Sequence, residues 1–274
     1  MVATPIGNLA DLTLRAYAAL SACDIVLAED TRVSGALLSA YGLHKKLVSL
    51  REHNEAAVAE RVVGWLGEGQ KIVQVSDAGT PGISDPGARL AATVWAAGYR
   101  VCPLPGPSAV VSALSAAGLD TGRFLFAGFL PPKSGQRRAQ LEAWREADYA
   151  VVCYEAPHRL LDCLEDMVAV YGENRPLVLA RELTKTFETF LRLPAGELAE
   201  RVRADSNQQR GECVLIIDAA PPAPAEEIDA ATLSLLEGMA AAMPVKQAAG
   251  LLAEYTGLPR KKLYELALKS RGND

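Results

Sequence analysis

The stretch KIVQVSDAGTPGISDPG, residues 71–87, is the part of the sequence that decides the predicted fold. It begins with a short run rich in β-branched side chains, residues 71–75, and passes directly into a loop of Ser, Asp, Gly, Thr and Pro. A helical pattern follows at residues 88–97. A short strand, a glycine-rich loop and a helix in this order are typical of one repeating unit of an α/β protein.

The same alternation extends on both sides of this stretch. In the first half, strands are predicted at residues 25–28, 47–50, 71–75 and 100–104, and helices at 12–20, 33–41, 55–66 and 88–97. We interpret this order as an α/β domain with a mainly parallel sheet. Residues 2–4 resemble the end of a further strand. Because only Met1 precedes them, either that strand is very short or the start codon has been placed a few residues late.

The second half has strand patterns that are spaced differently. Strands are predicted at residues 124–128, 149–154, 177–181, 188–193 and 213–218, and helices at 136–145, 159–171 and 197–204. The runs at 177–181 and 188–193 lie too close together for a helical crossover. They therefore predict a hairpin and a mixed sheet.

The fold class is thus α/β, with two α/β domains and a small helical C-terminal unit. Residues 1–118 are predicted as the N-terminal domain, with the boundary near 117–122, and residues 119–220 as the second domain. A Pro- and Ala-rich linker is expected at 219–225, followed by a helical unit over 226–274. There, residues 245–269 have the pattern of helix, turn and helix. Two interpretations stay open: a nucleic-acid-binding helix-turn-helix, or a packing appendage with a basic rim.

Composition excludes several classes of protein. Of the 274 residues, 50% are hydrophobic and 22% are charged, which indicates a globular rather than a disordered chain. With a net charge of −5, the chain as a whole does not attract nucleic acid electrostatically. Any RNA site must therefore be a local basic patch. The five cysteines form no CxxC pair and follow no signal peptide, which predicts a reduced, cytoplasmic location. The uncharged stretch 101–119 is broken by three prolines, so no membrane span is expected.

Familiar catalytic signatures are absent. The sequence has no G-x-G-x-x-G motif, no complete phosphate loop and no complete nucleophile elbow. His44, His53 and His158 are scattered without metal-ligand spacing. Dinucleotide, NTP, serine-hydrolase and zinc chemistry are therefore disfavoured, and we expect no metal site.

Four loops at predicted strand ends remain as the candidate site. They are residues 4–8, 28–32, 76–82 with its extension 85–87, and 105–109. Ligands of open α/β sheets bind at the carboxyl ends of the strands, and glycines there let the backbone approach a ligand closely. For any one of these loops taken alone, a turn or a helix cap is the preferred explanation. Together they predict one ligand crevice.

Six motifs in order along the chain carry a family resemblance. They are TPIGNL (4–9), AEDTR (28–32), SDAGTP (76–81), PGPSA (105–109), YEAPHR (154–159) and ARELTK (180–185). This series resembles the tetrapyrrole methylase superfamily, in the branch that acts on small-subunit ribosomal RNA, over residues 2–218. The resemblance implies two α/β domains of the tetrapyrrole methylase type, S-adenosylmethionine in the cleft between them, and a homodimer. It also implies methylation of the ribose 2′-hydroxyl of a decoding-centre cytidine in 16S rRNA, either free or in the 30S subunit.

Cofactor-binding residues follow from these motifs as a hypothesis. Asp77 would receive the α-amino group of S-adenosylmethionine, and loop N–H groups its carboxylate, with further donors at the helix start formed by Ser108 and Ala109. The resemblance implies that Tyr154, Glu155 and Leu183 border the adenosine. The complete predicted set is Pro5, Gly7, Asn8, Asp77, Ala78, Gly79, Thr80, Asp85, Ser108, Ala109, Tyr154, Glu155 and Leu183.

The 2′-hydroxyl is a weak nucleophile, so we expect a catalytic group to activate it. A general base contributes ~10²–10⁴ in rate, and the candidate carboxylates are Glu29, Asp30 and Glu182. Lys185 joins the catalytic set because, with Arg181, it would hold Glu182 ionised. Glu182 has the alternative of a structural ion pair, and Glu29 or Asp30 that of a helix cap. If no carboxylate acts, catalysis depends on positioning alone.

RNA contacts are expected at Arg32, Lys133, Arg137 and Arg138. Residues 133–145 carry four basic side chains against one acidic, after Pro131 and Pro132, which suits an exposed loop. A second basic cluster covers 259–274, and both clusters have the alternative of a solvated face. Two rival functions stay open: a methylase acting on a corrinoid or porphyrin ring, and a ribosome-binding factor without catalysis.

Overall fold

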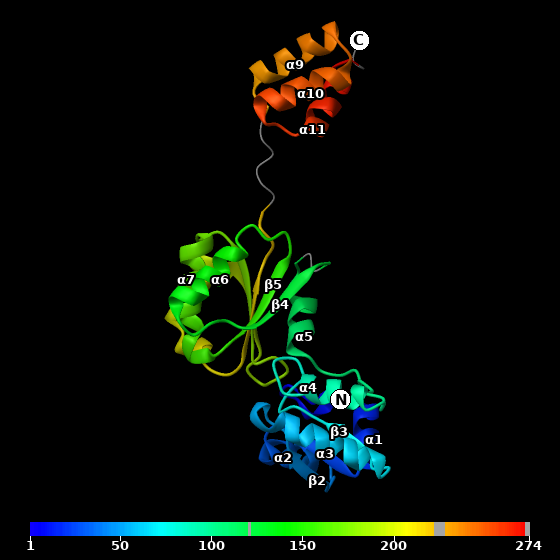
Figure 1. Cartoon of the computed structure of the whole chain (residues 1–274). Coiled ribbons are helices and arrows are strands. Elements are labelled where there is room, and N and C mark those ends of the chain that lie inside the picture. The colour runs from blue at the N-terminus through cyan, green and yellow to red at the C-terminus, as the bar shows by residue number, and fades with distance from the viewer. Residues whose placement is uncertain (120–121, 222–227, 272–274) are drawn as a thin grey trace. The chain divides into compact units, whose positions relative to one another are not determined.

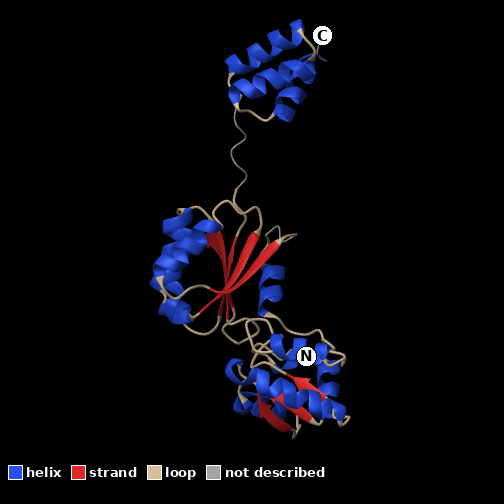
Figure 2. Ribbon diagram, in the orientation of Figure 1, coloured by secondary structure: helices blue, strands red, loops and turns tan. Residues whose placement is uncertain are grey.

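The computed structural model describes residues 1–119, 122–221 and 228–271. The chain divides into two compact units, Met1–Ala220 and Pro221–Asp274, and each is described by itself. Figures 1 and 2 show two sheets in the first unit and helices alone in the second. Part of the predicted linker (222–225), part of the predicted domain boundary (120–121) and residues 226–227 and 272–274 of the predicted helical unit lie outside the described residues.

The first sheet is parallel, as expected, with the order β2-β1-β3. Its strands are β1 (Ile25–Ala28), β2 (Lys46–Ser49) and β3 (Ile72–Gln74), in a register that pairs Ile25 with both Lys46 and Ile72. The helices are α1 (Leu14–Ala22), α2 (Thr31–Ala40), α3 (Glu55–Gly67) and α4 (Ala88–Ala96), with short 3₁₀ turns η1 (Leu9–Asp11) and η2 (Glu52–Asn54).

The central strand β1 is buried on both faces, because its side chains alternate between two helical layers. Val26 and Ala28 belong to the core that includes α1 and α2, whereas Ile25 and Leu27 belong to the core that includes α3 and α4. This explains why β1 is apolar at every position rather than at every second one. Its carboxyl end is therefore held rigidly.

The segments predicted as strands at 2–4 and 100–104 form isolated bridges instead, a parallel one between Val2 and Leu104 and an antiparallel one between Thr4 and Gly79. Val2 N donates to Gln74 O at 2.9 Å, and Leu104 N donates to Met1 O at 2.9 Å. Leu104 lies between Pro103 and Pro105, which have no N–H group, so the ladder does not extend. The prediction of a strand at 100–104 was therefore wrong.

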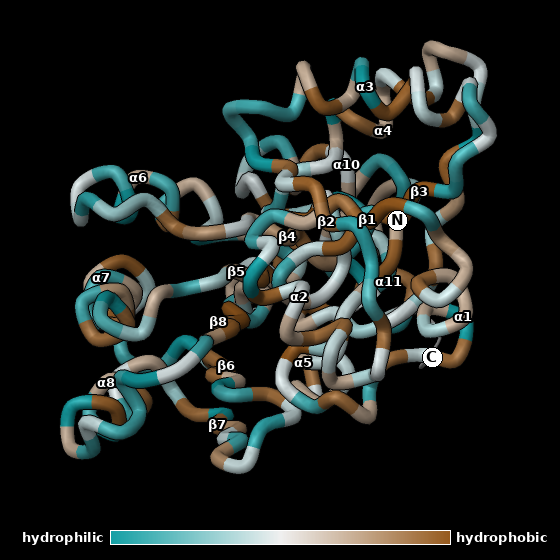
Figure 3. The backbone as a smooth tube through the Cα atoms, turned by 90° about the horizontal axis from the view of Figure 1, so that it is seen from below, coloured by the Kyte–Doolittle hydropathy of each residue, from teal (hydrophilic) through white to brown (hydrophobic). Residues whose placement is uncertain are grey.

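The second sheet is mixed, as the hairpin prediction required, with the order β4-β5-β8-β6-β7. Its strands are β4 (Phe124–Phe129), β5 (Ala150–Glu155), β6 (Pro176–Arg181), β7 (Thr189–Pro194) and β8 (Cys213–Ile217). β4 and β5 are parallel, and the remaining neighbours are antiparallel. One face is covered by α6 (Ser134–Ala143), α7 (Leu160–Tyr171) and α8 (Ala195–Ala204), and the turns η3 (Pro157–Arg159) and η4 (Ser206–Gln209) complete this half. In Figure 3, β8 is brown whereas α6 is mostly teal, as expected for a central strand beneath a surface helix.

The other face of this sheet is covered by α5 (Ala109–Ala116), as Figure 1 shows. Val110, Ala113 and Leu114 of α5 pack with Val152 and Ile216 of the second sheet. The predicted boundary at 118 had placed this helix in the first domain. Because its apolar side chains find their partners on β5, β6 and β8, the chain passes from one domain to the other before α5, at the loop 105–108.

The C-terminal unit consists of α9 (Ala230–Ala242), α10 (Val245–Thr256) and α11 (Arg260–Arg271). Its core contains Leu236, Ala248, Leu252 and Leu263, which are all buried. Gly257 ends α10 in a left-handed conformation with φ +75°, so the helix–turn–helix pattern predicted for residues 245–269 is present. Within the described residues, no helix has both the length and the apolar character that crossing a membrane requires.

Candidate active site

A cavity of about 490 Å³ lies in the unit Met1–Ala220 and is formed by loops of both α/β domains. Its size suits a small-molecule ligand. From the first domain and the crossover loop it is lined by Ile6, Glu29, Asp77, Ala78, Gly79, Thr80, Ile83, Ser84, Asp85, Ser108 and Ala109. From the second domain it is lined by Phe129, Tyr154, Glu155, Ala156, Pro157, Ala180, Leu183, Gly211, Glu212, Cys213 and Val214.

Three of the predicted loops are tied together by hydrogen bonds. Thr4 and Gly79 exchange two of them, at 2.9 and 3.0 Å, and Thr80 Oγ1 donates to Pro107 O at 3.1 Å. Gly79 has φ +77°, and a Cβ there would lie 3.4 Å from Ile6 Cγ2. Only glycine adopts this conformation without strain, so the loop depends on it.

Ser108 and Ala109 lie at the N-terminal end of α5, where the first backbone N–H groups of a helix have no partner within that helix. Ser108 is the N-cap residue, and its side chain makes no capping hydrogen bond. Backbone donors at such an end favour an anionic group, which is the role predicted for them toward a ligand carboxylate.

The cavity is strongly acidic. Five carboxylates line it, from Glu29, Asp77, Asp85, Glu155 and Glu212, and no Lys, Arg or His is among its described lining residues. Carboxylates gathered on one low-dielectric wall produce a negative potential that favours a cationic ligand. Within the described ranges, no three His, Cys, Asp or Glu side chains are grouped so as to hold a metal ion.

Glu155 contributes an unsatisfied acceptor. Its side chain is 2% exposed, and Oε1 lies 2.6 Å from Arg159 Nη2 and accepts from Ala156 N at 2.7 Å. The second oxygen, Oε2, is buried without a hydrogen-bond partner among the described residues. A buried acceptor of this kind is normally satisfied, and this oxygen is also shielded from the solvent in the cavity.

Asp77 and Asp30 have different roles although they touch. Asp77 Oδ1 accepts from Asp30 N at 3.0 Å, which fixes the Asp77 side chain at the cavity wall. Asp30 is the N-cap of α2 and accepts from Arg32 N at 2.8 Å and Arg32 Nε at 3.0 Å. These hydrogen bonds from Arg32 hold the pKa of Asp30 well below its usual range. Asp30 does not line the cavity, and the geometry favours the helix-cap alternative for it.

The surroundings of Glu29 and Asp85 raise the pKa of both carboxyl groups. Burial, followed by the charge of Asp77, raises the pKa of Glu29. Burial, followed by the charge of Glu29, raises the pKa of Asp85 to about 6. The ionised form of each carboxyl is therefore destabilised in the cavity, and a bound cation would stabilise it.

We expect Asp85→Asn to raise the Tm of the unliganded protein at pH 7.5, because the folded protein then no longer holds that unfavourable charge. A carboxyl whose folded pKa is raised destabilises the fold fully above about pH 6, and this cost disappears as the pH falls towards the ordinary value of 3.8. The gain in Tm should therefore shrink between pH 6 and pH 4 in thermal unfolding scans. A gain that is constant over this range would show that Asp85 is not protonated there.

Glu182 and Lys185 form a structural ion pair next to the cavity. Lys185 Nζ lies 2.7 Å from Glu182 Oε1 and 3.1 Å from Glu212 Oε2, and Glu182 Oε1 also accepts from Glu212 N at 3.0 Å. Burial opposes the charge of Glu182, but hydrogen bonds from Lys185 and Glu212 N lower its pKa overall. Although burial alone would lower the pKa of Lys185, its contacts with Glu182 and Glu212 raise it. Neither Glu182 nor Lys185 lines the cavity. Their position therefore favours a structural ion pair over a catalytic role.

The loop 4–8 closes against this ion pair from the first domain. A Cβ on Gly7 would lie 2.4 Å from Lys185 Cγ and 2.9 Å from Thr184 Oγ1, so only glycine permits this contact. Pro5 is buried, and the Asn8 side chain accepts from Ala10 N at 3.0 Å to cap η1. Pro5, Gly7 and Asn8 were predicted as cofactor-binding residues, but they are not among the described residues that line the cavity.

The remaining ten predicted cofactor residues line the cavity together, and the structure adds others. Glu212 and Val214 were missed because the sequence was searched only at the carboxyl ends of strands. β8 runs antiparallel to β5, so its amino-terminal end reaches the same edge of the sheet. Phe129 does lie at a carboxyl end, that of β4, and this rule could have found it.

The four predicted RNA contacts differ in accessibility. Arg137 is 3% exposed, and its guanidinium is bound to Asp166 at 2.7 Å through Nε and 2.5 Å through Nη2. The structure does not favour Arg137 as a phosphate contact, because this side chain of α6 is buried against Asp166. Lys133 and Arg138 are exposed, and the Arg32 side chain is 87% exposed beside Asp30.

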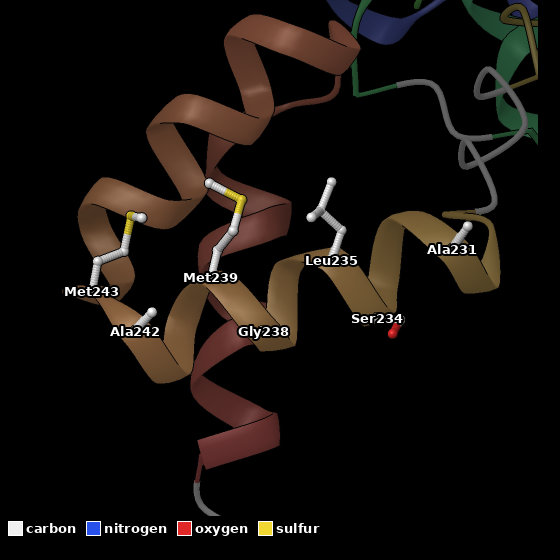
Figure 4. Close-up of a pocket in the computed structure, with 7 residues that line it drawn as sticks. All are labelled: Ala231, Ser234, Leu235, Gly238, Met239, Ala242 and Met243. Carbon is white, nitrogen blue, oxygen red and sulfur yellow. The ribbon is translucent and has the colours of Figure 1, made fainter.

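A second hollow, of about 610 Å³, runs along α9 in the C-terminal unit (Figure 4). Its walls carry no titratable side chain and consist of Ala231, Ser234, Leu235, Gly238, Met239, Ala242 and Met243. It therefore lacks the groups that chemistry would need.

Two α/β domains closed around a carboxylate-lined cavity define this chain as a protein of the tetrapyrrole methylase class. Residues 1–199 match the family model "Tetrapyrrole (Corrin/Porphyrin) Methylases", and residues 226–271 match "RsmI C-terminal HTH domain". Among solved structures, uroporphyrin-III-C-methyltransferase from Thermus thermophilus has a TM-score of 0.56 at 22% identity, over 79% of this chain and 92% of that one. The methyltransferase CobJ has a TM-score of 0.58 at 20% identity, over 79% and 91%. These likenesses concern the fold.

Curated relatives are much closer in sequence. The protein named ribosomal RNA small subunit methyltransferase I from Neisseria meningitidis serogroup B is 51% identical over 98% of this chain and 92% of its own length. The protein of the same name from Escherichia coli O157:H7 is 50% identical over 99% and 95%. The chain belongs to the tetrapyrrole methylase family and, within it, to the family of proteins named ribosomal RNA small subunit methyltransferase I. The family and the fold class predicted from the sequence are confirmed.

Proposed function

We propose that this chain methylates the ribose 2′-hydroxyl of cytidine 1402 in 16S rRNA, with S-adenosylmethionine as the methyl donor. The observation that carries the proposal is the cavity itself, which brings five carboxylates and a helix N-terminus together between the two domains. The names of the relatives support small-subunit rRNA as the substrate, either free or in the 30S subunit. The free state of all five cysteines supports a reduced, cytoplasmic setting.

The cavity residues fit S-adenosylmethionine by charge. The molecule carries a cationic sulfonium and a cationic α-amino group, and the acidic wall of Glu29, Asp77 and Asp85 would favour both. Its single anionic group, the carboxylate, would accept from N–H groups at the start of α5. Tyr154, Glu155 and Leu183 line the cavity together and would border the adenosine.

When bound, S-adenosylmethionine supplies a methyl group that its sulfonium sulfur has already activated for transfer to an oxygen. The chain has to hold the 2′-oxygen in line with that methyl and keep water out. Positioning of this quality is worth up to ~7–11 kcal/mol. Glu29 lies on the cavity wall with a raised pKa, and we assign it the role of taking the proton of the 2′-hydroxyl.

The rival reading, methylation of a tetrapyrrole ring, has less support from the comparisons. It rests on solved structures that are 20–22% identical, whereas the relatives that are 50–51% identical are named ribosomal RNA small subunit methyltransferase I. Family membership also leads us to propose a homodimer, and light scattering on the purified protein tests it.

The direct test of the proposed function is to map ribose methylation on small-subunit rRNA from cells with and without this protein. We expect one methylated cytidine to disappear and to return when the purified protein and S-adenosylmethionine are added. An unchanged methylation map, with intact cofactor binding, would remove rRNA as the substrate. Failure to bind S-adenosylmethionine would remove the enzyme assignment.

Replacing Asp77 by asparagine should weaken S-adenosylmethionine binding about tenfold to a hundredfold, because a charge-assisted hydrogen bond to the α-amino group is lost. Asparagine still offers an oxygen to Asp30 N, so the wall should keep its shape. Isothermal titration calorimetry measures the change. The matched control is Asp162→Asn, an exposed aspartate on α7 that does not line the cavity. Equal affinity for both variants would exclude Asp77 from the site.

A further inference from the structure

An irregularity in the pairing of β4 with β5 sets the direction of the Phe129 side chain. Phe126 pairs with Val152 and Phe129 with Tyr154, so three steps along β4 match two steps along β5. The extra residue forms a β-bulge, in which Gly128 has φ +67°. Side chains three positions apart on a regular strand point to opposite faces. Here the rings of Phe126 and Phe129 both contact Tyr154, with centroids 5.0 and 5.5 Å away.

Phe129, which follows the bulge, remains largely exposed. Phe129 lines the cavity and is nevertheless 58% exposed. The first domain brings a second exposed apolar side chain to the same cavity, Ile83, which is 46% exposed. Its neighbour Ser84 lies beside the bulge, since a Cβ on Gly128 would be 3.5 Å from Ser84 Oγ. Ser84 itself is held at φ +62°, a conformation that costs energy and is found mainly at functional sites.

Charge decides which part of an RNA nucleotide can reach this place. The five carboxylates inside the cavity would repel a phosphate, whereas a ribose and a nucleobase are neutral. To bring a 2′-hydroxyl to the cavity, an RNA must therefore leave its phosphates outside and turn the sugar and the base inward. A base turned out of its stack needs a flat apolar surface to replace its lost neighbours.

On the basis of the proposed function, we infer that Phe129 is the stacking platform for the base of the target nucleotide. Tyr154 supports the ring from one side, and the base covers the other. In this proposal, the bulge at Gly128 orients the Phe129 ring so that its free face can contact the base. Phe129 is thus a positioning residue, which holds the nucleotide so that its 2′-oxygen faces the methyl donor.

Kinetics of three substitutions test this inference. Phe129→Ala should raise KM for the small-subunit rRNA substrate about 5- to 150-fold, the range for loss of one base–aromatic stack. Phe129→Tyr keeps a π face and should restore KM to near the wild-type value, whereas Phe129→Leu keeps only apolar volume and should resemble alanine. S-adenosylmethionine affinity, measured by calorimetry on the same proteins, should stay within about twofold of wild type.

The matched control is Phe124→Ala. Phe124 begins the same strand and is 47% exposed, but it does not line the cavity, so its loss should leave KM unchanged. An unchanged KM for Phe129→Ala, or equal values for the leucine and tyrosine variants, overturns the inference. A rise in the cofactor dissociation constant that accounts for the lost activity also overturns it and assigns Phe129 to the adenine. If wild-type protein methylates no rRNA, the proposed function has failed instead.

Discussion

Replacing Glu29 by glutamine should lower kcat for rRNA methylation by about 10²–10⁴ while S-adenosylmethionine affinity changes little. Glutamine keeps the size and polarity of the side chain but cannot take a proton. Of the three carboxylates that the sequence offers as a base, Glu29 alone lines the cavity. Asp30 is occupied as the cap of α2, and Glu182 is held by Lys185 and Glu212 N.

The same role predicts a pH dependence for wild-type turnover. A base must be ionised, so kcat/KM for the cofactor, which reports the free enzyme, should fall as the pH drops through the pKa of Glu29. Burial and the charge of Asp77 raise that pKa above its ordinary 4.5, so the fall begins at a higher pH than for a free glutamate. Values of kcat/KM measured from pH 8 downward should show this limb, and the Glu29→Gln variant should lose it.

Asp30→Asn and Glu182→Gln are the matched comparisons, because they were the other two candidates. Both should retain turnover within about tenfold. Glu182→Gln should lower the Tm, because its ion pair with Lys185 is lost, whereas Asp30→Asn should change the Tm little, because asparagine caps a helix about as well as aspartate. If Glu182→Gln alone abolishes turnover, the base is Glu182 and the ion pair must open during catalysis. If all three variants stay active, catalysis depends on positioning without a protein base.

Replacing Arg137 by alanine should lower the free energy of unfolding by about 3–5 kcal/mol. Arg137 and Asp166 are both buried, at 3% exposure each, and form their ion pair inside the layer of α6 and α7. Ser134 Oγ and Arg138 Nε also bind Asp166, at 2.8 and 2.5 Å, but Arg138 is half-exposed. Removing Arg137 leaves Asp166 with an incomplete set of partners away from water.

Urea unfolding followed by circular dichroism measures this loss, and Lys133→Ala is the control. Lys133 precedes α6, is exposed and makes no capping hydrogen bond, so its loss should change stability by less than about 0.5 kcal/mol. For RNA affinity the order is reversed: Lys133→Ala should weaken binding and reduce its salt dependence. If Arg137→Ala is as stable as wild type but binds rRNA less tightly, the original assignment of Arg137 to RNA is correct.

Local sequence determined much of this protein. Apolar runs such as Ile25–Ala28 and the glycine loop at Gly79 determined the strands and their ends, because alternation and backbone freedom are properties of short stretches. Ten of the thirteen predicted cofactor residues line one cavity. Residues 77–80 do so because they follow the carboxyl end of β3, whereas Tyr154, Glu155 and Leu183 were implied by the family resemblance. The sequence also sufficed for the mixed sheet, through the short spacing between β6 and β7.

Tertiary structure alone decided which charged side chains are available for chemistry. Glu29 and Asp30 are neighbours in sequence, yet one lines the cavity and the other caps a helix. Arg137 and Arg138 are neighbours as well, yet the first is buried against Asp166 and the second is half-exposed. The physical reason is that a charge acts through its surroundings, and burial, ion pairs and the direction of β8 arise only when segments far apart in the chain pack together.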